Sequence, residues 1–200
     1  MNEIIETSEN VSVTEPATVS AEPEKEDRVI KYLKSLNKPP QNRAASAHLR
    51  RGLGKPPKTA MEMFPYLGRF LSNDTKPNYE NTVFIVAALF AYYPDAKNTS
   101  GNLGASLREL KENSDSIEKR FVALLNAEAE DLPYYLRQII GLLKSNDVAV
   151  NWERLFKDIQ SWNSDKRFVQ QKWAEQFWGN YPNNTENNQN SQPNKGETNK

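Results

Sequence analysis

The chain has 200 residues, with 26 basic and 26 acidic side chains, one histidine and no cysteine, which excludes disulfides, thiolate metal sites and a cysteine nucleophile. The N-terminus is acidic, no apolar signal segment follows it, and the longest apolar run, residues 83–93, is about half of the roughly 20 residues that span a bilayer. We therefore expect a soluble, cytoplasmic protein.

The formally neutral total conceals three segments of different charge. Residues 1–26 contain seven Glu and one Lys, residues 27–178 contain 23 basic and 17 acidic side chains, and residues 179–200 are rich in Asn and Gln. The two ends have too few apolar residues to offset chain entropy, so we expect a disordered acidic head and a disordered Asn/Gln-rich tail. The middle segment is long enough to bury a substantial core.

The first part of the middle segment predicts four helices, because apolar residues recur at helical spacing between turn-forming residues. They cover residues 28–36, 41–51, 60–71 and 79–93. Pro39 and Pro40 follow the first helix, Gly52 is expected to end the second as its C′ residue, and Pro65 is expected to bend the third. The fourth is apolar on every side and stops before Pro94, so we expect it to be buried.

The second part predicts five helices, over residues 103–112, 116–129, 132–145, 152–162 and 165–178. Asp131 and Asn151 each precede a helix and are typical N-cap residues. The four tryptophans lie at helical spacing, which indicates core positions (Trp152, Trp162, Trp173 and Trp178).

No alternating pattern in the chain predicts a strand. The expected fold class is therefore all-α, with about eight or nine short helices. The turn-forming residues 94–102 favour two small packed bundles, residues 27–98 and residues 99–178.

Catalysis has little support in this sequence. His48 is the only histidine, and the carboxylates Glu128, Glu130 and Asp131 lie at a helix junction, where capping and the helix dipole account for them. The glycines at 52–55 lack the spacing of a phosphate-binding loop, and the GxxG at 101–104 is typical of a loop that enters a helix. We expect no enzyme activity, no cofactor and no metal site.

Basic residues gather near the start of the middle segment. Nine occur there without a single Asp or Glu between the first and the last (Arg28, Lys31, Lys34, Lys38, Arg43, Arg50, Arg51, Lys55 and Lys58). Both signs normally mix on a solvated surface, and a run of one sign attracts polyanions, of which nucleic acid is the commonest. For any one of these residues an ordinary solvated charge remains the simpler interpretation.

Helical spacing groups further cations. Arg43 and Arg50 share a face, with Arg51 at the helix end, and Arg137 and Lys144 oppose the apolar stripe of residues 132–145. Tyr134, on the outer side of that helix, could stack on a base, although a solvated tyrosine is the simpler account. The remaining candidates lie on three other predicted helices (Arg108, Lys111, Arg120 and Arg167).

The stretch WERLFKDIQSWNSDKRFVQQKWAEQFW, residues 152–178, resembles the C-terminal pattern of the CasB family, the small subunit of the type I-E CRISPR surveillance complex, Cascade. That pattern has a Trp opening one helix, an Asp-(Ile/Leu)-x-x-Trp end, and a final Trp-Ala-x-x-Phe-Trp. Weaker matches keep the family's order upstream (residues 49–52, 87–91, 101–104, 118–121 and 136–137). The resemblance spans about residues 43–178.

The resemblance implies an all-helical, non-catalytic subunit, present in two copies, that touches the hybrid of guide RNA and target DNA and holds the displaced DNA strand. The implied partners are the other Cascade subunits, guide RNA, target DNA and a second copy of the chain. Basic residues in the matching blocks are Arg50, Arg51, Arg120 and Arg137, and Lys166 and Arg167 correspond less closely. Arg43, Arg108, Lys111 and Lys144 rest on helix geometry alone.

The sequence thus favours a sequence-independent clamp on nucleic acid, in which arginines on several helices neutralise phosphates and stabilise an R-loop. The alternative is a protein-only helical scaffold whose basic surface docks on acidic partner subunits. The acidic head could also fold onto the basic surface and suppress stray binding.

Overall fold

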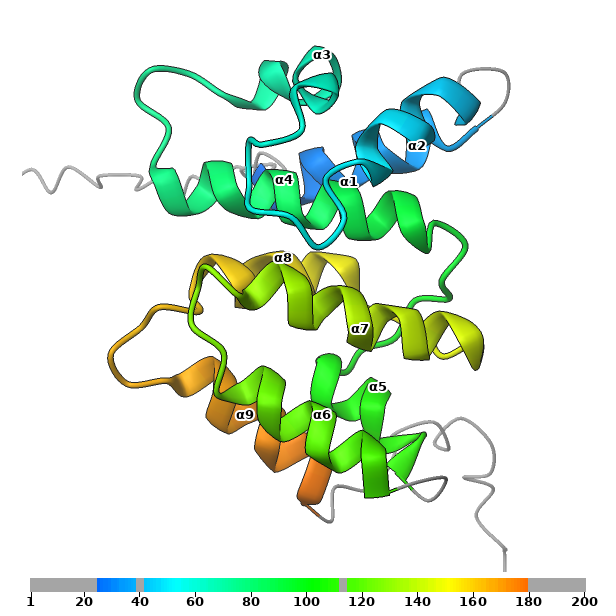
Figure 1. Ribbon diagram of the computed structural model, residues 1–200, viewed down its shortest axis with the longest axis vertical. Coiled ribbons are helices and arrows are strands. Elements are labelled where there is room, and N and C mark those ends of the chain that lie inside the picture. Colours follow the sequence, from blue (N-terminus) through cyan, green and yellow to red (C-terminus); the bar gives the residue numbers. More distant parts are fainter. Residues whose placement is uncertain (1–24, 39–41, 112–114, 180–200) are drawn as a thin grey trace, which may run out of the picture.

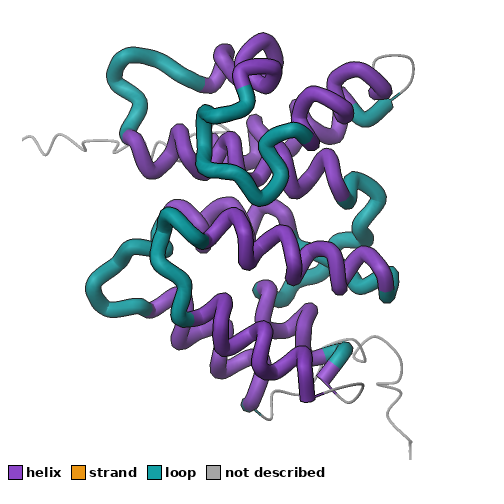
Figure 2. Tube along the Cα trace, in the orientation of Figure 1, coloured by secondary structure: helices purple, strands orange, loops and turns teal. Residues whose placement is uncertain are grey.

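The structure, a computed structural model, describes residues 25–38, 42–111 and 115–179, and the expected head and tail lie almost wholly outside this range (Figure 1). Within it the chain forms nine α-helices and two short 3-10 helices and no strand, which confirms the all-α prediction (Figure 2). None of the helices in the described residues combines the length and the apolar character that crossing a membrane would need.

Helix α4 (Pro77–Tyr92) is the central element. Ten consecutive residues, Thr82 to Ala91, are buried, as its apolar circumference predicts. It contacts α1 (Lys25–Leu36), α2 (Asn42–Arg50), α7 (Leu132–Ser145) and α8 (Trp152–Gln160), and Figure 1 shows it running between α2 above and the α7–α8 pair below.

The third predicted helix is wrong in detail. Residues 60–71 form not one bent helix but three short pieces, η1 (Met61–Met63), α3 (Phe64–Leu67) and η2 (Gly68–Phe70). Pro65 lies in the first turn of α3, where its missing N–H costs nothing, but its ring prevents one helix from running through.

The second half contains α5 (Leu103–Arg108), α6 (Asp115–Leu125) and α9 (Phe168–Trp178), with α5 packed on α9 and α6 packed on α7. Helix α9 begins three residues later than predicted, because Arg167 at its N-cap has a left-handed φ of 47°. Helix α6 ends at Leu125, four residues earlier than predicted.

One of the two predicted caps is present. The Asn151 side chain accepts a hydrogen bond from the Arg154 N–H at 2.9 Å and caps α8. Asp131 precedes α7 in helical backbone geometry, makes no side-chain cap, and so does not match the prediction. Gly52 is not the left-handed residue after α2 either; among the described glycines that conformation belongs to Gly54, with φ +70°.

A hydrophobic core cluster contains side chains from both predicted bundles. Trp152, Trp162 and Trp173 are buried in it as predicted, whereas Trp178 is 38% exposed and the prediction for it is wrong. The predicted boundary falls in the loop between α4 and α5, and the division into two bundles stays a prediction.

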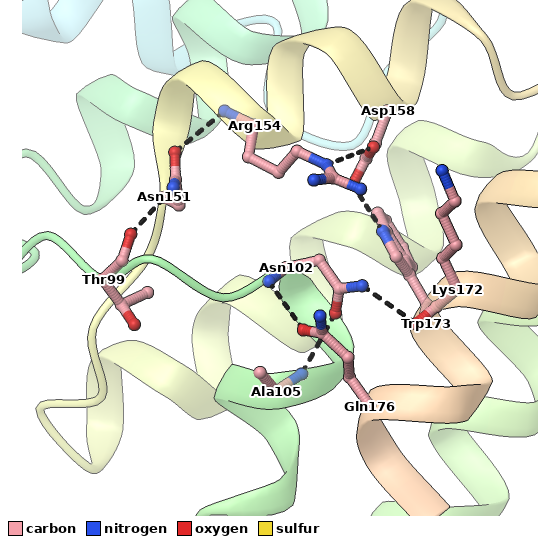
Figure 3. Close-up of polar contacts among 9 residues, drawn as sticks. All are labelled: Thr99, Asn102, Ala105, Asn151, Arg154, Asp158, Lys172, Trp173 and Gln176. Atoms are coloured by element: carbon pink, nitrogen blue, oxygen red, sulfur yellow. Dashed lines mark hydrogen bonds and ion pairs between the residues drawn. The ribbon is translucent and has the colours of Figure 1, made fainter. Parts of the chain in front are cut away.

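Polar side chains join α5, α8 and α9 in what we call the α5–α8–α9 junction, formed by Asn102, Arg154, Asp158, Trp173 and Gln176 (Figure 3). The Trp173 indole donates to Asp158 at 2.6 Å, and Arg154 Nε donates to the other carboxylate oxygen at 2.8 Å. Burial raises the pKa of Asp158, and these donors oppose the rise. Two residues of the resemblance, Asp158 and Trp173, therefore hold helices together.

Asn102 completes the junction from the α5 side. Its side chain accepts from the Ala105 N–H and donates to the Lys172 carbonyl, while its own N–H donates to Gln176 at 3.0 Å. The GxxG segment is therefore a helix entry, as expected. A Cβ on Gly104 would overlap the Trp173 carbonyl oxygen, so only glycine lets α5 approach α9 this closely.

Candidate nucleic-acid interface

Two cations from opposite halves of the sequence meet at the C-terminal end of α4. Arg50 Nε, from the last residue of α2, donates to the Ala91 carbonyl at 2.7 Å, and Lys144 Nζ, from the last turn of α7, donates to the Tyr92 carbonyl at 2.7 Å. The last carbonyls of a helix have no partner within it and carry the negative end of its dipole, so they attract positive side chains.

The outer face of α7 continues this site. Lys144 Nζ lies 4.3 Å from the centroid of the Tyr92 ring, and the Tyr92 hydroxyl approaches Gly141, one turn earlier on the same face. Arg137, another turn earlier, packs its Cδ against Gly54 in the loop that follows α2. We call this row of Arg50, Tyr92, Arg137 and Lys144, with Gly54, the cationic seam.

The seam retains donor capacity. Arg50 is exposed and bonds to Ala91 through Nε, which leaves the donors of both terminal nitrogens unused in that bond. Lys144 uses one of three ammonium donors on a carbonyl, and the Arg137 side chain is exposed. Two turns of helix separate Arg137 from Lys144, about 10 Å at 1.5 Å per residue, so the seam presents cations along a line.

Acidic side chains neutralise part of the nine-cation run in the structure. Lys34 pairs with Glu153 at 3.1 Å, Lys58 pairs with Glu80 at 2.6 Å, and Arg51 pairs with Glu62. A hydrogen bond to its own backbone and the Arg51 guanidinium lower the pKa of Glu62. The prediction of an unpaired run is therefore wrong for these three cations, because the carboxylates come from elements that follow the run in the sequence.

The remaining candidates do not join the seam. Arg43 is exposed on α2, and Arg120 is exposed on α6. Lys111 lies 5.5 Å from the centroid of Phe177, Arg108 is half-buried on α5, and Arg167 donates to the Leu125 carbonyl beside exposed Lys166. Helices α5, α6 and α9 occupy the lower end of Figure 1 and α2 the upper end, so these cations are distributed along the molecule.

Sequence reasoning misses Tyr92 and Gly54. Tyr92 ends the apolar run of α4 and its spacing groups it with the core, and Gly54 stands out in the sequence only as part of a phosphate-loop fragment. A tyrosine at the C-terminal end of a buried helix is a usable signal, because one edge of its ring can pack while the other meets solvent. Tyr134 is 56% exposed, with its ring 5.4 Å from that of Tyr135, and stacking by it stays a prediction.

The single histidine of the chain contacts a tyrosine. His48 Nδ1 lies 3.1 Å from the Tyr66 hydroxyl, and the ring is half-buried against α3. No group of three or more His, Asp or Glu side chains in the described ranges is arranged to hold a metal ion.

Comparison with known proteins identifies the family. The family described as CRISPR-associated protein Cse2 matches residues 45–178. A protein of that name from Thermus thermophilus is 32% identical over 154 residues, which are 76% of this chain and 89% of the relative. The chain belongs to the Cse2 family, also called CasB, as the tryptophan pattern indicated.

Solved structures of similar proteins support the same family assignment. The crystal structure of a Cse2-family protein from Thermus thermophilus has a TM-score of 0.70 and 32% identity, covering 77% of this chain and 97% of its own. A chain in a structure named "CRISPR RNA-guided surveillance complex" has a TM-score of 0.62 and 26% identity, covering 76% of this chain and 91% of its own.

Proposed function

We propose that this protein is the small, non-catalytic subunit of a type I-E CRISPR surveillance complex, Cascade, and that the cationic seam binds the sugar–phosphate backbone of nucleic acid. Family membership and the 26% identical chain in an RNA-guided surveillance complex support the assembly. The observation that carries the binding role is the convergence of Arg50 and Lys144, from α2 and α7, on the end of α4, with Arg137 beside Gly54 two turns back along α7.

The physical role follows from the energetics of strand exchange. Replacing a DNA duplex with a guide–target hybrid and a free strand is nearly balanced in free energy, so modest contacts to the products decide the outcome. Cations held in place by helix carbonyls would contact phosphates without reading bases, and sequence specificity would stay with the guide RNA. Proposed partners are the other Cascade subunits, guide RNA, target DNA, the displaced strand and a second copy of the chain.

The seam is tested by removing its three cations together, as Arg50→Gln, Arg137→Gln and Lys144→Gln. The measurement is fluorescence anisotropy of a labelled twenty-nucleotide oligothymidine across a salt series, with thermal unfolding as the check on the fold. Each single-strand phosphate contact contributes about 0.7 to the slope of log K against log salt, so the triple variant is expected to flatten that slope by about 2.

The matched control changes net charge by the same amount elsewhere, as Lys31→Gln, Lys38→Gln and Lys119→Gln, all exposed in the structure. If binding depends on the seam, this control keeps most of the salt slope. An equal loss in both triple variants would mean that net charge, and not the seam, attracts the oligonucleotide, and the proposal would then fail.

The rival function, a protein-only scaffold, gains support from the ion pairs that neutralise Lys34, Arg51 and Lys58. It predicts that the wild-type chain binds no oligonucleotide at any salt concentration and still assembles with partner subunits. Arg43, Arg51, Arg108, Lys111, Arg120, Lys166 and Arg167 remain proposed contacts, each open to the same salt-slope measurement.

A further inference from the structure

A groove lies beside Leu132, at the N-terminal end of α7. It consists of two hollows of about 400 and 380 Å³. The hollows adjoin, because they share four lining residues, and we refer to the pair as the groove (Ala129, Glu130, Trp162 and Asn163). The loop between α6 and α7 forms one wall, and the loop between α8 and α9 forms the other.

The second hollow is acidic. Glu128, Glu130 and Asp165 line it, all three are exposed, and none has an ion pair within residues 25–38, 42–111 and 115–179. Arg167 also lines it, but its guanidinium donates to the Leu125 carbonyl. We call this second hollow, which Gln170 also lines, the acidic groove; it is one half of the whole groove.

Gln170 provides an independent sign of a missing partner. Its side chain is 7% exposed, Nε2 donates to the Trp162 carbonyl at 3.0 Å, and Oε1 has no hydrogen-bond partner among the described residues. The Nε2 bond fixes which end of the amide is the acceptor, so the orphan atom at this wall is a carbonyl oxygen. Buried acceptors without a donor are rare in folded proteins, and each one calls for an explanation.

Arg167 keeps unused donors in the hollow, but three carboxylates against one guanidinium leave the hollow net negative, so it favours a donor-rich cation. An arginine guanidinium carries five N–H donors in a plane and no acceptor, which suits two carboxylates at once. The carboxylates repel phosphates, so nucleic acid is disfavoured here. In the described residues no three acidic side chains converge as a metal ion requires.

The first hollow adds a place for the residues that flank such an arginine. Pro57, Ile85 and Leu132 give it apolar walls, and Asn81 and Gln160 give it amide donors and acceptors. Apolar surface with a few polar groups suits a peptide, whose side chain fills the hollow while its backbone bonds to the amides. We propose that the groove binds an extended segment of a neighbouring protein subunit, with an apolar side chain in the first hollow and an arginine in the acidic groove.

This proposal does not depend on nucleic-acid binding by the seam. It is tested on the full-length chain, labelled with ¹⁵N and titrated with the blocked peptide acetyl-Ala-Leu-Arg-Leu-Ala-amide. Expected shifts fall on the Trp162 indole N–H, which donates to Ala127 at the groove, and on the Gln170 side-chain amide. The same peptide with citrulline, the neutral isostere of arginine, should bind about tenfold more weakly, because it lacks the charge-assisted bonds.

Variants identify the groove as the site. Glu130→Gln with Asp165→Asn should weaken the arginine peptide about tenfold, whereas the control Glu109→Gln with Glu175→Gln, two acids elsewhere in the fold, should leave it unchanged. Reversal to Glu130→Arg with Asp165→Arg should transfer preference to the peptide that carries Glu in place of Arg. The seam triple variant should bind the arginine peptide as the wild type does.

Three results would overturn the proposal. They are the absence of any shift with the arginine peptide, equal binding of the citrulline peptide, and shifts of the same resonances by oligothymidine. The last result would assign the groove to nucleic acid instead of a protein segment.

Discussion

At the α5–α8–α9 junction the Asp158 carboxylate and the Asn102 amide are bonded at both ends inside the protein, whereas at the cationic seam the protein orients cations that keep unused donors. The Asp158 carboxylate accepts hydrogen bonds from both Trp173 and Arg154 at the junction. Arg50 and Lys144 at the seam each use one donor on a carbonyl. Satisfied polar groups stabilise the fold, and groups with capacity left over can bind a partner.

The comparison also separates two kinds of family resemblance. The tryptophan pattern that is most specific in the sequence builds the junction, and its indole N–H groups are committed to carbonyl or carboxylate acceptors at Trp162 and Trp173. The cations of the seam come from short upstream matches and from helix spacing. The residues that identify the family are therefore largely different from those that we propose to carry its function.

The largest expected effect comes from the glycine that the junction requires. Gly104→Ala places a methyl group against the Trp173 backbone, so α5 and α9 have to separate, and we expect a loss of about 3 kcal/mol in the free energy of unfolding. Urea denaturation measures it. Gly68→Ala is the control, since a Cβ there meets nothing within 4 Å. Equal stability of the two variants would show that the junction is more plastic than its geometry indicates.

The glycine of the seam should respond differently. Gly54→Ala puts an L-residue at φ +70° and crowds the Arg137 side chain, which is flexible and can move away. We expect a smaller loss of stability, about 1–2 kcal/mol for the left-handed backbone. Displacement of Arg137 should also flatten the salt slope for oligothymidine by about 0.7, one phosphate contact. A stability loss with an unchanged slope would remove Arg137 from the proposed interface.

The sequence predicts local features of the fold better than it predicts the seam, and the reason is physical. Burial of α4, the Asn151 cap and the helix entry at Asn102 depend on residues within a few positions of one another, where spacing determines the outcome. The seam depends on Arg50 and Lys144 reaching the same helix end from different halves of the chain. Local periodicity contains no information about that meeting.

The same limit explains the errors over charge. Lys34, Arg51 and Lys58 are neutralised by Glu153, Glu62 and Glu80, which belong to other elements, so counting acids within the run could not reveal the pairs. The acidic groove escapes sequence reasoning for a related reason. Helix-end compensation accounts for Glu128 and Glu130 in the sequence, and only the fold brings Asp165 and Gln170 to line the same hollow.

A smaller effect is expected at the buried carboxylate of the junction. Asp158→Asn keeps one acceptor but turns an amide donor toward Arg154 or Trp173, so one bond is lost, at about 1 kcal/mol at neutral pH. Burial raises the pKa of Asp158 in the folded state above its ordinary 3.8, so the native protein holds this proton more tightly than the unfolded chain.

The sign of the pH dependence follows. The contribution of Asp158 to stability is fully present below the unfolded pKa of 3.8 and is lost as pH rises through the raised folded pKa. The Asp158→Asn variant has no carboxyl group at this position, so its stability does not fall in this way as pH rises. The difference in unfolding free energy between wild type and variant should therefore narrow from pH 4 to pH 7. Urea titrations at a series of pH values measure it. A difference that widens over that range would mean that Asp158 is stabilised as the anion.

The smallest effect on stability is expected from a variant that frees a cation which the fold has neutralised with a carboxylate. Glu62→Gln removes the carboxylate that pairs with Arg51, and both side chains are well exposed, so the melting temperature at neutral pH should hardly change. Arg51, directly after α2 and beside Arg50, then becomes available to phosphate. The salt slope for oligothymidine should steepen by about 0.7, and Glu109→Gln, at the end of α5 in the other half of the chain, should leave it unchanged. If neither slope moves, Arg51 does not belong to the surface that nucleic acid reaches, and the proposed interface narrows to the residues of the seam itself.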